Sequence, residues 1–229
     1  MGTKKLLIAG NWKSNKTIGE AHTWLEAFSL QIANCKLQIE KSEIVIFPSF
    51  IHLSLFSDVI QKNSLPFELG AQDISPFEKG SYTGAVAGSQ LVGLASWVLI
   101  GHSERRNHFG ETDHQLEQKV LLARDNGLSV LYCVPDEKTP IPPHVAVVAY
   151  EPVWAIGSGK AETPENANRV IQTIKRQNEV KTVIYGGSVT EKNVSAFVHQ
   201  ESIDGVLSGG ASLDANQFIQ LIIHASHNS

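Results

Sequence analysis

The 229-residue sequence predicts an α/β protein in which eight parallel strands close into a (β/α)8 barrel. Short apolar runs alternate with amphipathic helical patterns almost from end to end, as expected for strand–helix units joined by right-handed crossovers. One of these runs, 145–150, is apolar or aromatic throughout, which is typical of a strand buried on both faces. A doubly wound open sheet is the alternative, but no G-x-G-x-x-G motif follows the first strand.

The first half of the chain is predicted to hold four strand–helix units. Apolar Trp24, Phe28 and Ile32 recur at helical spacing in the first helix, and Gly127 follows the fourth helix as its C-cap. The strands are expected at 5–9, 43–47, 67–71 and 97–100, and the helices at 18–35, 51–61, 87–94 and 113–126.

The second half is expected to contribute strands at 129–134, 145–150, 182–185 and 205–207. Thr163 as N-cap and Pro164 as first helical residue begin the helix after the sixth strand, and the segment 175–181 runs almost straight into strand seven. Two further helices are expected at 191–199 and 214–224.

The connection between strands five and six, 135–144, should contain no helix because four of its residues are prolines. Ten extended residues span up to about 33 Å, more than the ~17–20 Å of a typical strand, so the barrel can still close. Without a helix there, we expect Ala146, Val148 and Tyr150 to face outward with less helical cover, so that either neighbouring helices lean in or another chain covers them.

The composition indicates one globular domain over residues 1–229. The chain is 42% hydrophobic and 18% charged, with no linker or low-complexity segment. A net charge of −4 gives no support to nucleic-acid binding, and no apolar run is long enough for a signal peptide. Two cysteines without C-x-x-C spacing argue against a disulfide framework or a zinc site. We expect a cytoplasmic protein with no membrane partner.

The stretch 145–160 combines a buried strand with a carboxylate and a glycine-rich end. The strand ends on Glu151, and Pro152 prevents the ladder from continuing. Four apolar residues and then Gly-Ser-Gly are typical of a lid that excludes water. On its own, Glu151 could equally cap the next helix, with Trp154 as ordinary core. The pair Gly159-Lys160 is not a P-loop, because Ala161 stands where Ser or Thr is needed.

In a (β/α)8 barrel the active site is built from loops at the carboxyl ends of the strands. Glycine-rich turns after strands seven and eight commonly bind phosphate there through backbone N–H groups. A single lysine at such a position is more simply a solvated surface charge, a single histidine a structural residue and a glycine pair a tight turn. Only their shared location at the strand ends favours a functional site. The residues at these positions are Asn11, Lys13, His102, Glu104, Glu151, Ser188, Gly209 and Gly210.

Five segments in order along the whole chain resemble the triosephosphate isomerase family, whose fold is the TIM barrel. They read NWK (11–13), IGHSERR (100–106), AYEPVWAIGSGK (149–160), YGGSV (185–189) and GGASL (209–213). The resemblance implies interconversion of dihydroxyacetone phosphate and D-glyceraldehyde 3-phosphate through an enediolate, with no cofactor and no metal.

The resemblance also implies roles for individual residues. Glu151 would move the proton between carbons, neutral His102 would polarise the carbonyl, and Lys13 would stabilise the developing oxyanion. Asn11 would help to orient the site, with Glu104 in support. The phosphate would be held by Gly157, Ser188, Gly209 and Gly210.

The loop 74–83 resembles the family's dimer loop, in which Thr83 would support the partner's site, so we expect a homodimer. Ala85 stands where the family usually carries Glu, which puts one polar contact between subunits in doubt. Two rival interpretations remain: another phosphate-binding barrel, such as a sugar-phosphate isomerase of amino-acid biosynthesis, and an inactive barrel kept as a binding scaffold.

Overall fold

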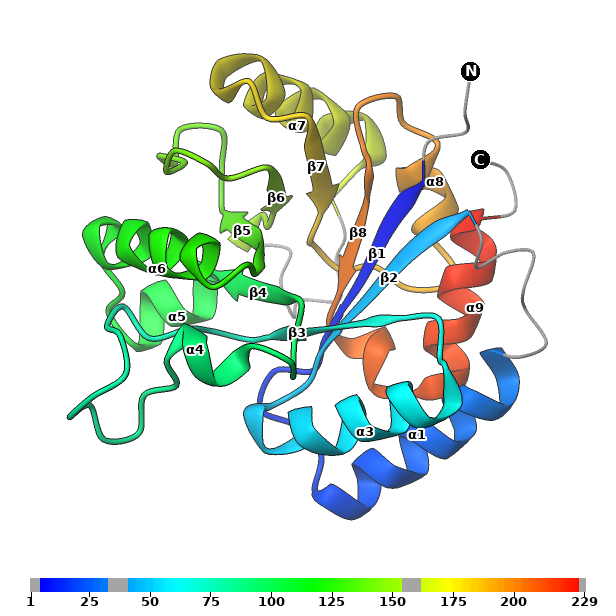
Figure 1. Cartoon of the computed structure of the whole chain (residues 1–229). Helices are drawn as coiled ribbons and strands as arrows, with labels where there is room; N and C mark the ends of the chain where they lie inside the picture. Colours follow the sequence, from blue (N-terminus) through cyan, green and yellow to red (C-terminus); the bar gives the residue numbers. More distant parts are fainter. Residues whose placement is uncertain (1–4, 33–40, 154–161, 227–229) are drawn as a thin grey trace.

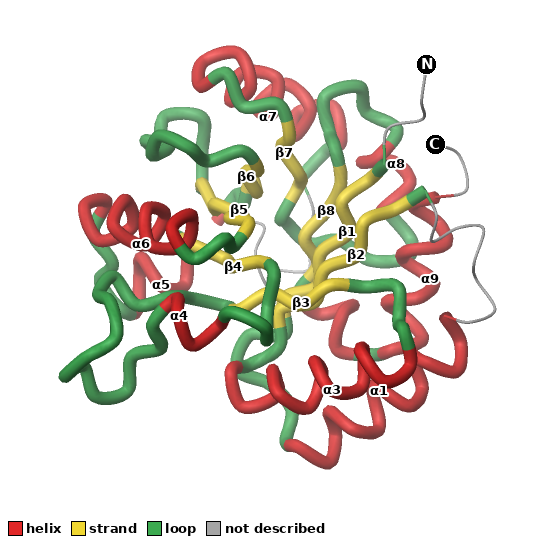
Figure 2. The backbone as a smooth tube through the Cα atoms, in the orientation of Figure 1, coloured by secondary structure: helices red, strands yellow, loops and turns green. Residues whose placement is uncertain are grey.

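A computed structural model describes residues 5–32, 41–153 and 162–226. Its eight parallel strands pair in chain order, and β8 pairs with β1, so the sheet is a closed barrel surrounded by helices (Figures 1 and 2). The strands are β1 (Leu6–Asn11), β2 (Ser42–Phe47), β3 (Glu68–Ala71), β4 (Trp97–Ile100), β5 (Ser129–Val134), β6 (Val147–Tyr150), β7 (Thr182–Tyr185) and β8 (Gly205–Ser208). The predicted fold class is confirmed.

The helices follow the strands in the expected alternation, but several are shorter than the sequence suggests. They are α1 (Ile18–Ile32), α3 (Leu53–Asn63), α4 (Gly88–Leu91), α5 (Ser103–His108), α6 (Asp113–Asp125), α7 (Pro164–Asn178), α8 (Val194–Val198) and α9 (Ala215–Ser226), with short 3-10 turns η1 (Phe50–His52) and η3 (Gly210–Leu213). Helix α5 was not predicted. The C-cap of α6 is Asn126, one position before the predicted cap Gly127, which follows it with φ of +72°.

The barrel has two apolar layers, because successive side chains of each strand point to opposite faces. The inner layer fills the barrel and the outer layer packs the strands against the helices. In β6, Val147 and Ala149 contact the inner layer, whereas Val148 and Tyr150 belong to the outer layer. Glu151 is therefore the next residue in the inward-facing register.

An aromatic cluster fixes the loop after β1 against the helices. The indole N–H groups of Trp12 and Trp24 both donate to the main-chain oxygen of Ser212, each at 3.1 Å. The Trp12 ring meets Trp24 and Phe56 edge to face, with both centroid distances 5.1 Å. Edge-to-face packing of this kind stabilises aromatic pairs beyond simple burial.

The connection between β5 and β6 contains no helix, as its prolines predicted. Of the three residues expected to face outward, two are covered within the chain. Val148 and Tyr150 are buried, at 0% and 5% exposure, whereas Ala146 is exposed. Ile141, from the proline-rich connection itself, is half-buried against the same outer layer. The connection thus covers part of the wall that a helix covers elsewhere.

Closure of the barrel makes Gly205 a sensitive position. A Cβ at this residue, whose φ is +155°, would lie 1.9 Å from the main-chain oxygen of Leu7, directly across the β8–β1 ladder. We expect Gly205→Ala to lower the free energy of unfolding by roughly 4 kcal/mol or more, because only main-chain displacement relieves the clash. Urea denaturation followed by circular dichroism measures this.

Gly19→Ala is the matched control, because Gly19 lies in α1 and no atom lies within 4 Å of the position that a methyl group would take there. That substitution should leave stability unchanged or raise it by up to ~1 kcal/mol, since alanine favours helix. A native-like midpoint for Gly205→Ala would contradict this account of closure.

Candidate active site

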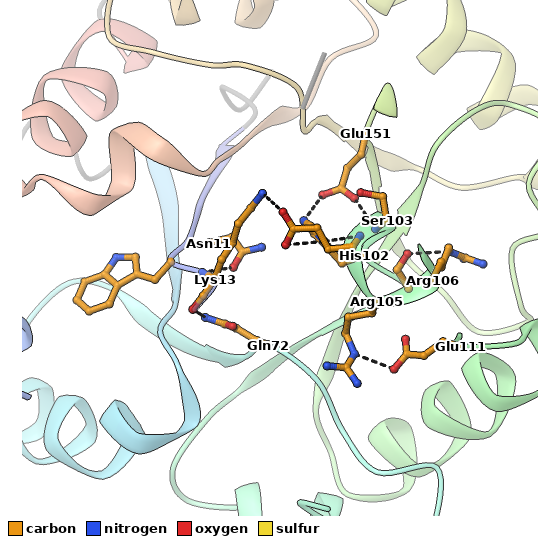
Figure 3. A network of polar contacts seen from close by, with 12 residues as sticks. Asn11, Lys13, Gln72, His102, Ser103, Arg105, Arg106, Glu111 and Glu151 are labelled. Carbon is orange, nitrogen blue, oxygen red and sulfur yellow. Dashed lines mark hydrogen bonds and ion pairs between the residues drawn. The ribbon is translucent and has the colours of Figure 1, made fainter. Parts of the chain in front are cut away.

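One cavity of about 380 Å³ opens at the carboxyl ends of the strands and contains nearly all the residues predicted for the site. Figure 3 shows Lys13, His102 and Glu151, from the ends of β1, β4 and β6, in one polar network. The predicted residues among its lining are Asn11, Lys13, His102, Glu151, Ser188, Gly209 and Gly210. Gly157 lies outside the described residues, and exposed Thr83 is not part of this lining.

The Glu151 carboxylate and the His102 imidazole face each other in the cavity wall. Glu151 Oε1 lies 3.3 Å from His102 Nε2, and the two residues are 2% and 5% exposed. The main-chain N–H of Glu104 donates to His102 Nδ1 at 3.2 Å. Nδ1 is therefore occupied as an acceptor, and Nε2 is the ring nitrogen that lies toward the carboxylate.

Glu151 is held from several sides. Its main-chain N–H donates to Val134 at 2.8 Å, and its Oε2 accepts a long hydrogen bond, 3.4 Å, from the N–H of Ser103. A Cβ on Gly186 would lie 2.8 Å from Glu151 Cγ, so only glycine leaves room for the carboxylate here. Burial and the neighbouring Glu151 carboxylate raise the pKa of the Cys133 thiol well above its ordinary value. The thiol therefore stays neutral and adds no second negative charge beside Glu151.

Lys13 has an unusual backbone and an ion pair that directs its side chain. Its φ of +52° lies in the left-handed region, which is uncommon for a residue other than glycine. The Nζ atom forms an ion pair with Glu104 Oε1 at 2.5 Å, and the main-chain N–H donates to Asn11 Oδ1 at 2.9 Å. Glu104 thus supports both Lys13 and His102, as expected from its place after β4.

Two further residues hold the Lys13 main chain and were missed by the sequence reasoning. Ser49 Oγ and Gln72 Nε2 both donate to the Lys13 carbonyl oxygen, each at 2.9 Å (Gln72 in Figure 3). Gln72 directly follows β3, so the rule that selected the other strand-end residues would have found it. Ser49 stands two residues beyond β2, where no local pattern marks it.

The glycine-rich turns after β7 and β8 line the same cavity as the carboxylate. Gly210 begins the 3-10 turn η3, and nothing lies within 4 Å of the position a Cβ would take there. The nearest atom to a Cβ on Gly209 would be Cε of Lys13, at 3.7 Å. Exposed main-chain N–H groups beside a lysine are a favourable arrangement for an anion.

A second network anchors α5, whose N-cap is His102. Arg105 pairs with Asp73 at 2.8 Å and with Glu111 at 2.7 Å, and Lys119 bridges the same two carboxylates. Burial raises the pKa of Asp73, against the lowering effect of these cations. These long-range pairs fix the helix that positions the imidazole.

No group of three or more potential metal ligands (His, Cys, Asp or Glu) occurs within 5–32, 41–153 and 162–226. Within the same residues, no helix has the length and apolar character required to cross a membrane.

Comparison with known proteins points to one family. The sequence model of the family described as triosephosphate isomerase matches residues 6–144 and 140–225. Triosephosphate isomerase of Mesomycoplasma hyopneumoniae is 38% identical over 244 residues, which cover 96% of this chain and 100% of that protein. The enzymes of Dehalococcoides mccartyi and Mycoplasmopsis pulmonis are 37% and 39% identical, each covering at least 96% of this chain and 97% of the relative.

The raised pKa of Cys133 makes its chemical reactivity testable. In a Cys35→Ser background, we expect iodoacetamide to modify Cys133 of the folded protein only as fast as the protein unfolds, because the thiol is buried and remains neutral. Mass spectrometry between pH 7 and 9 should show no acceleration, whereas urea should make the thiol react at once. Rapid labelling that rises with pH would refute the assigned environment.

Proposed function

The chain belongs to the triosephosphate isomerase family and interconverts dihydroxyacetone phosphate and D-glyceraldehyde 3-phosphate in glycolysis, and we propose that Glu151, His102 and Lys13 perform this reaction. The observation that carries the assignment is the buried pair of Glu151 Oε1 and His102 Nε2, 3.3 Å apart in the cavity wall. A base and a hydrogen-bond donor so placed can act on adjacent atoms of one small substrate.

In the proposed reaction Glu151 removes a proton from the carbon next to the substrate carbonyl. The N–H at Nε2 of His102 donates to the carbonyl oxygen as negative charge develops on it. Protons then exchange between the two oxygens of the enediolate through His102, and Glu151 returns its proton to the neighbouring carbon. Two hydrogens change place and nothing is oxidised overall, so the sequence of steps requires neither a redox cofactor nor a metal.

Electrostatic stabilisation of the enediolate is assigned to Lys13, with Asn11 orienting the lysine main chain. A preorganised ammonium costs no reorganisation when the charge appears. Glu104 holds that ammonium at the edge of the cavity through their ion pair. We assign the substrate phosphate to the main-chain N–H groups near Ser188, Gly209 and Gly210, which line the same cavity. From the sequence alone, we also assign Gly157 to phosphate binding and the segment after Pro152 to a lid that excludes water.

We further propose that the protein works as a cytoplasmic homodimer. On the loop 74–83, which projects away from the barrel in Figure 1, the exposed rings of Phe77 and Tyr82 stack at 4.3 Å between centroids. A second apolar side chain, Phe109, is 70% exposed beside a hollow near Arg105. Apolar side chains gathered in this way are typical of a protein interface.

Ala85 stands where the family usually carries Glu, so one polar contact between subunits is in doubt. The partner subunit need not supply another group in place of that Glu. The guanidinium of Arg105, which lines the same hollow as Ala85, is paired with Asp73 and Glu111 of its own chain. We assign to Thr83 the role of supporting the active site of the partner.

Glu151→Gln tests the catalytic assignment. The substitution keeps the size of the side chain and removes the base, so we expect kcat to fall by at least ~10²–10⁴-fold with little change in thermal stability. A coupled assay with glyceraldehyde 3-phosphate measures the rate. Glu117→Gln, an exposed carboxylate on α6, is the control and should retain full activity. A near-normal rate in Glu151→Gln would remove Glu151 from the mechanism.

The dimer is tested by replacing Phe77 and Tyr82 together with serine. Loss of the stacked rings should shift the protein toward monomer in analytical ultracentrifugation and lower the activity at dilute concentration. Val92→Ser is the matched control, because Val92 is 58% exposed but lies outside the loop 74–83. If the double variant sediments as the unmodified protein does, the loop is not the interface.

A further inference from the structure

The segment that carries Lys13 between β1 and α1 contains two strained residues. Lys13 and Lys16 both have left-handed φ values, +52° and +71°, although neither is glycine. Such residues persist only where surrounding groups hold them, and they concentrate at functional sites. The groups that hold this segment therefore bear on the position of the Lys13 ammonium.

Two of those groups come from the turn after β2. Ser49 Oγ donates to the Lys13 carbonyl at 2.9 Å, and the ring Nε2–H of His52 donates to the Lys16 carbonyl at 2.9 Å. The main-chain N–H of His52 also donates to the carbonyl of Ser49 at 2.9 Å, so the two side chains are parts of one rigid turn. Each strained lysine thus has its carbonyl fixed by a side chain from the same turn.

The environment of His52 indicates that the role of its imidazole is to donate a hydrogen bond to the Lys16 carbonyl. The residue is fully buried, and its ring meets Trp12 edge to face with 6.0 Å between centroids. Its Nδ1 has no hydrogen-bond partner within the described residues. A buried nitrogen without a partner is destabilising, and phenylalanine would fill the same space without it. What histidine supplies and phenylalanine does not is the Nε2–H donor.

We propose that Ser49 and His52 are positioning residues for Lys13. By fixing both left-handed carbonyls they keep the segment 13–16 in the conformation that directs the ammonium to Glu104 and the cavity. Gln72 adds a third donor, to the Lys13 carbonyl. This inference rests on the proposed catalytic role of Lys13, and neither Ser49 nor His52 lines the cavity that contains Glu151.

The first experiment compares His52→Phe, His52→Gln and Ser49→Ala. Because a displaced catalytic group can cost up to ~10²-fold, we expect His52→Phe and Ser49→Ala to lower kcat roughly tenfold, with a smaller change in KM. Glutamine places an N–H donor near the position of Nε2, so His52→Gln should recover most of that loss. Thermal unfolding should show that all three variants are folded at the assay temperature.

Ser195→Ala is the matched control, since Ser195 Oγ donates to the main-chain oxygen of His224 at 2.8 Å between α8 and α9. Its removal deletes a bond of the same kind and should leave kcat unchanged. The proposal is overturned if His52→Phe retains the native kcat, or if His52→Gln loses as much activity as His52→Phe.

A double-mutant cycle separates positioning from a general structural effect. In a Lys13→Arg background, where the cation is already displaced, His52→Phe should cost several-fold less than in the native background. Equal losses in both backgrounds would overturn the positioning role. Lys13→Ala is measured in parallel: normal activity there would refute the proposed role of Lys13 itself. A slow Lys13→Ala beside a fully active His52→Phe would refute the positioning role alone.

Discussion

The pairing of β8 with β1 is the constraint on which the rest of the molecule depends. Four residue pairs, from Leu7 with Gly205 to Gly10 with Ser208, join the two ends of the sheet. Since all eight strands are parallel, closure brings their carboxyl ends to one opening. Lys13, from the start of the chain, thereby lines the same cavity as the glycine turn near its end. An open sheet would leave these groups at opposite edges.

The site within that opening is ordered by contacts that reach across the sequence. The N–H of Glu104 donates to Nδ1 of His102, and the helix that His102 caps is fixed by ion pairs from Arg105 to residues on two other segments. Glu151 is limited on one side by the bare backbone of Gly186. Each reactive group thus has its orientation set by a neighbour that takes no part in the chemistry, which is how preorganised sites avoid reorganisation during reaction.

Much of this arrangement could be predicted because local sequence patterns indicate it. Buried parallel strands are short apolar runs, and the residue type that follows each strand identifies the polar groups at the opening. Helix α5 escaped prediction because its six residues are mostly polar and charged, so it shows no apolar periodicity, and long-range ion pairs stabilise it. The cover of the outer wall near β6 was not identified from the sequence, because it includes Ile141 from an irregular connection. The contact of Ser49 with Lys13 depends on how neighbouring loops meet, which no local pattern records.

The proline-rich connection has an implication for chain topology. The connection runs between two paired strands and contains no helical hydrogen bonds. A break in the chain there would therefore leave the pairing of β5 with β6 in place. Meanwhile the first strand and the last helix adjoin, because Ser42 pairs with Leu6 and its hydroxyl lies 2.9 Å from that of Ser226. A circular permutant, with a peptide linker joining α9 to β1 and new termini opened at the prolines, would preserve every strand pairing of the barrel.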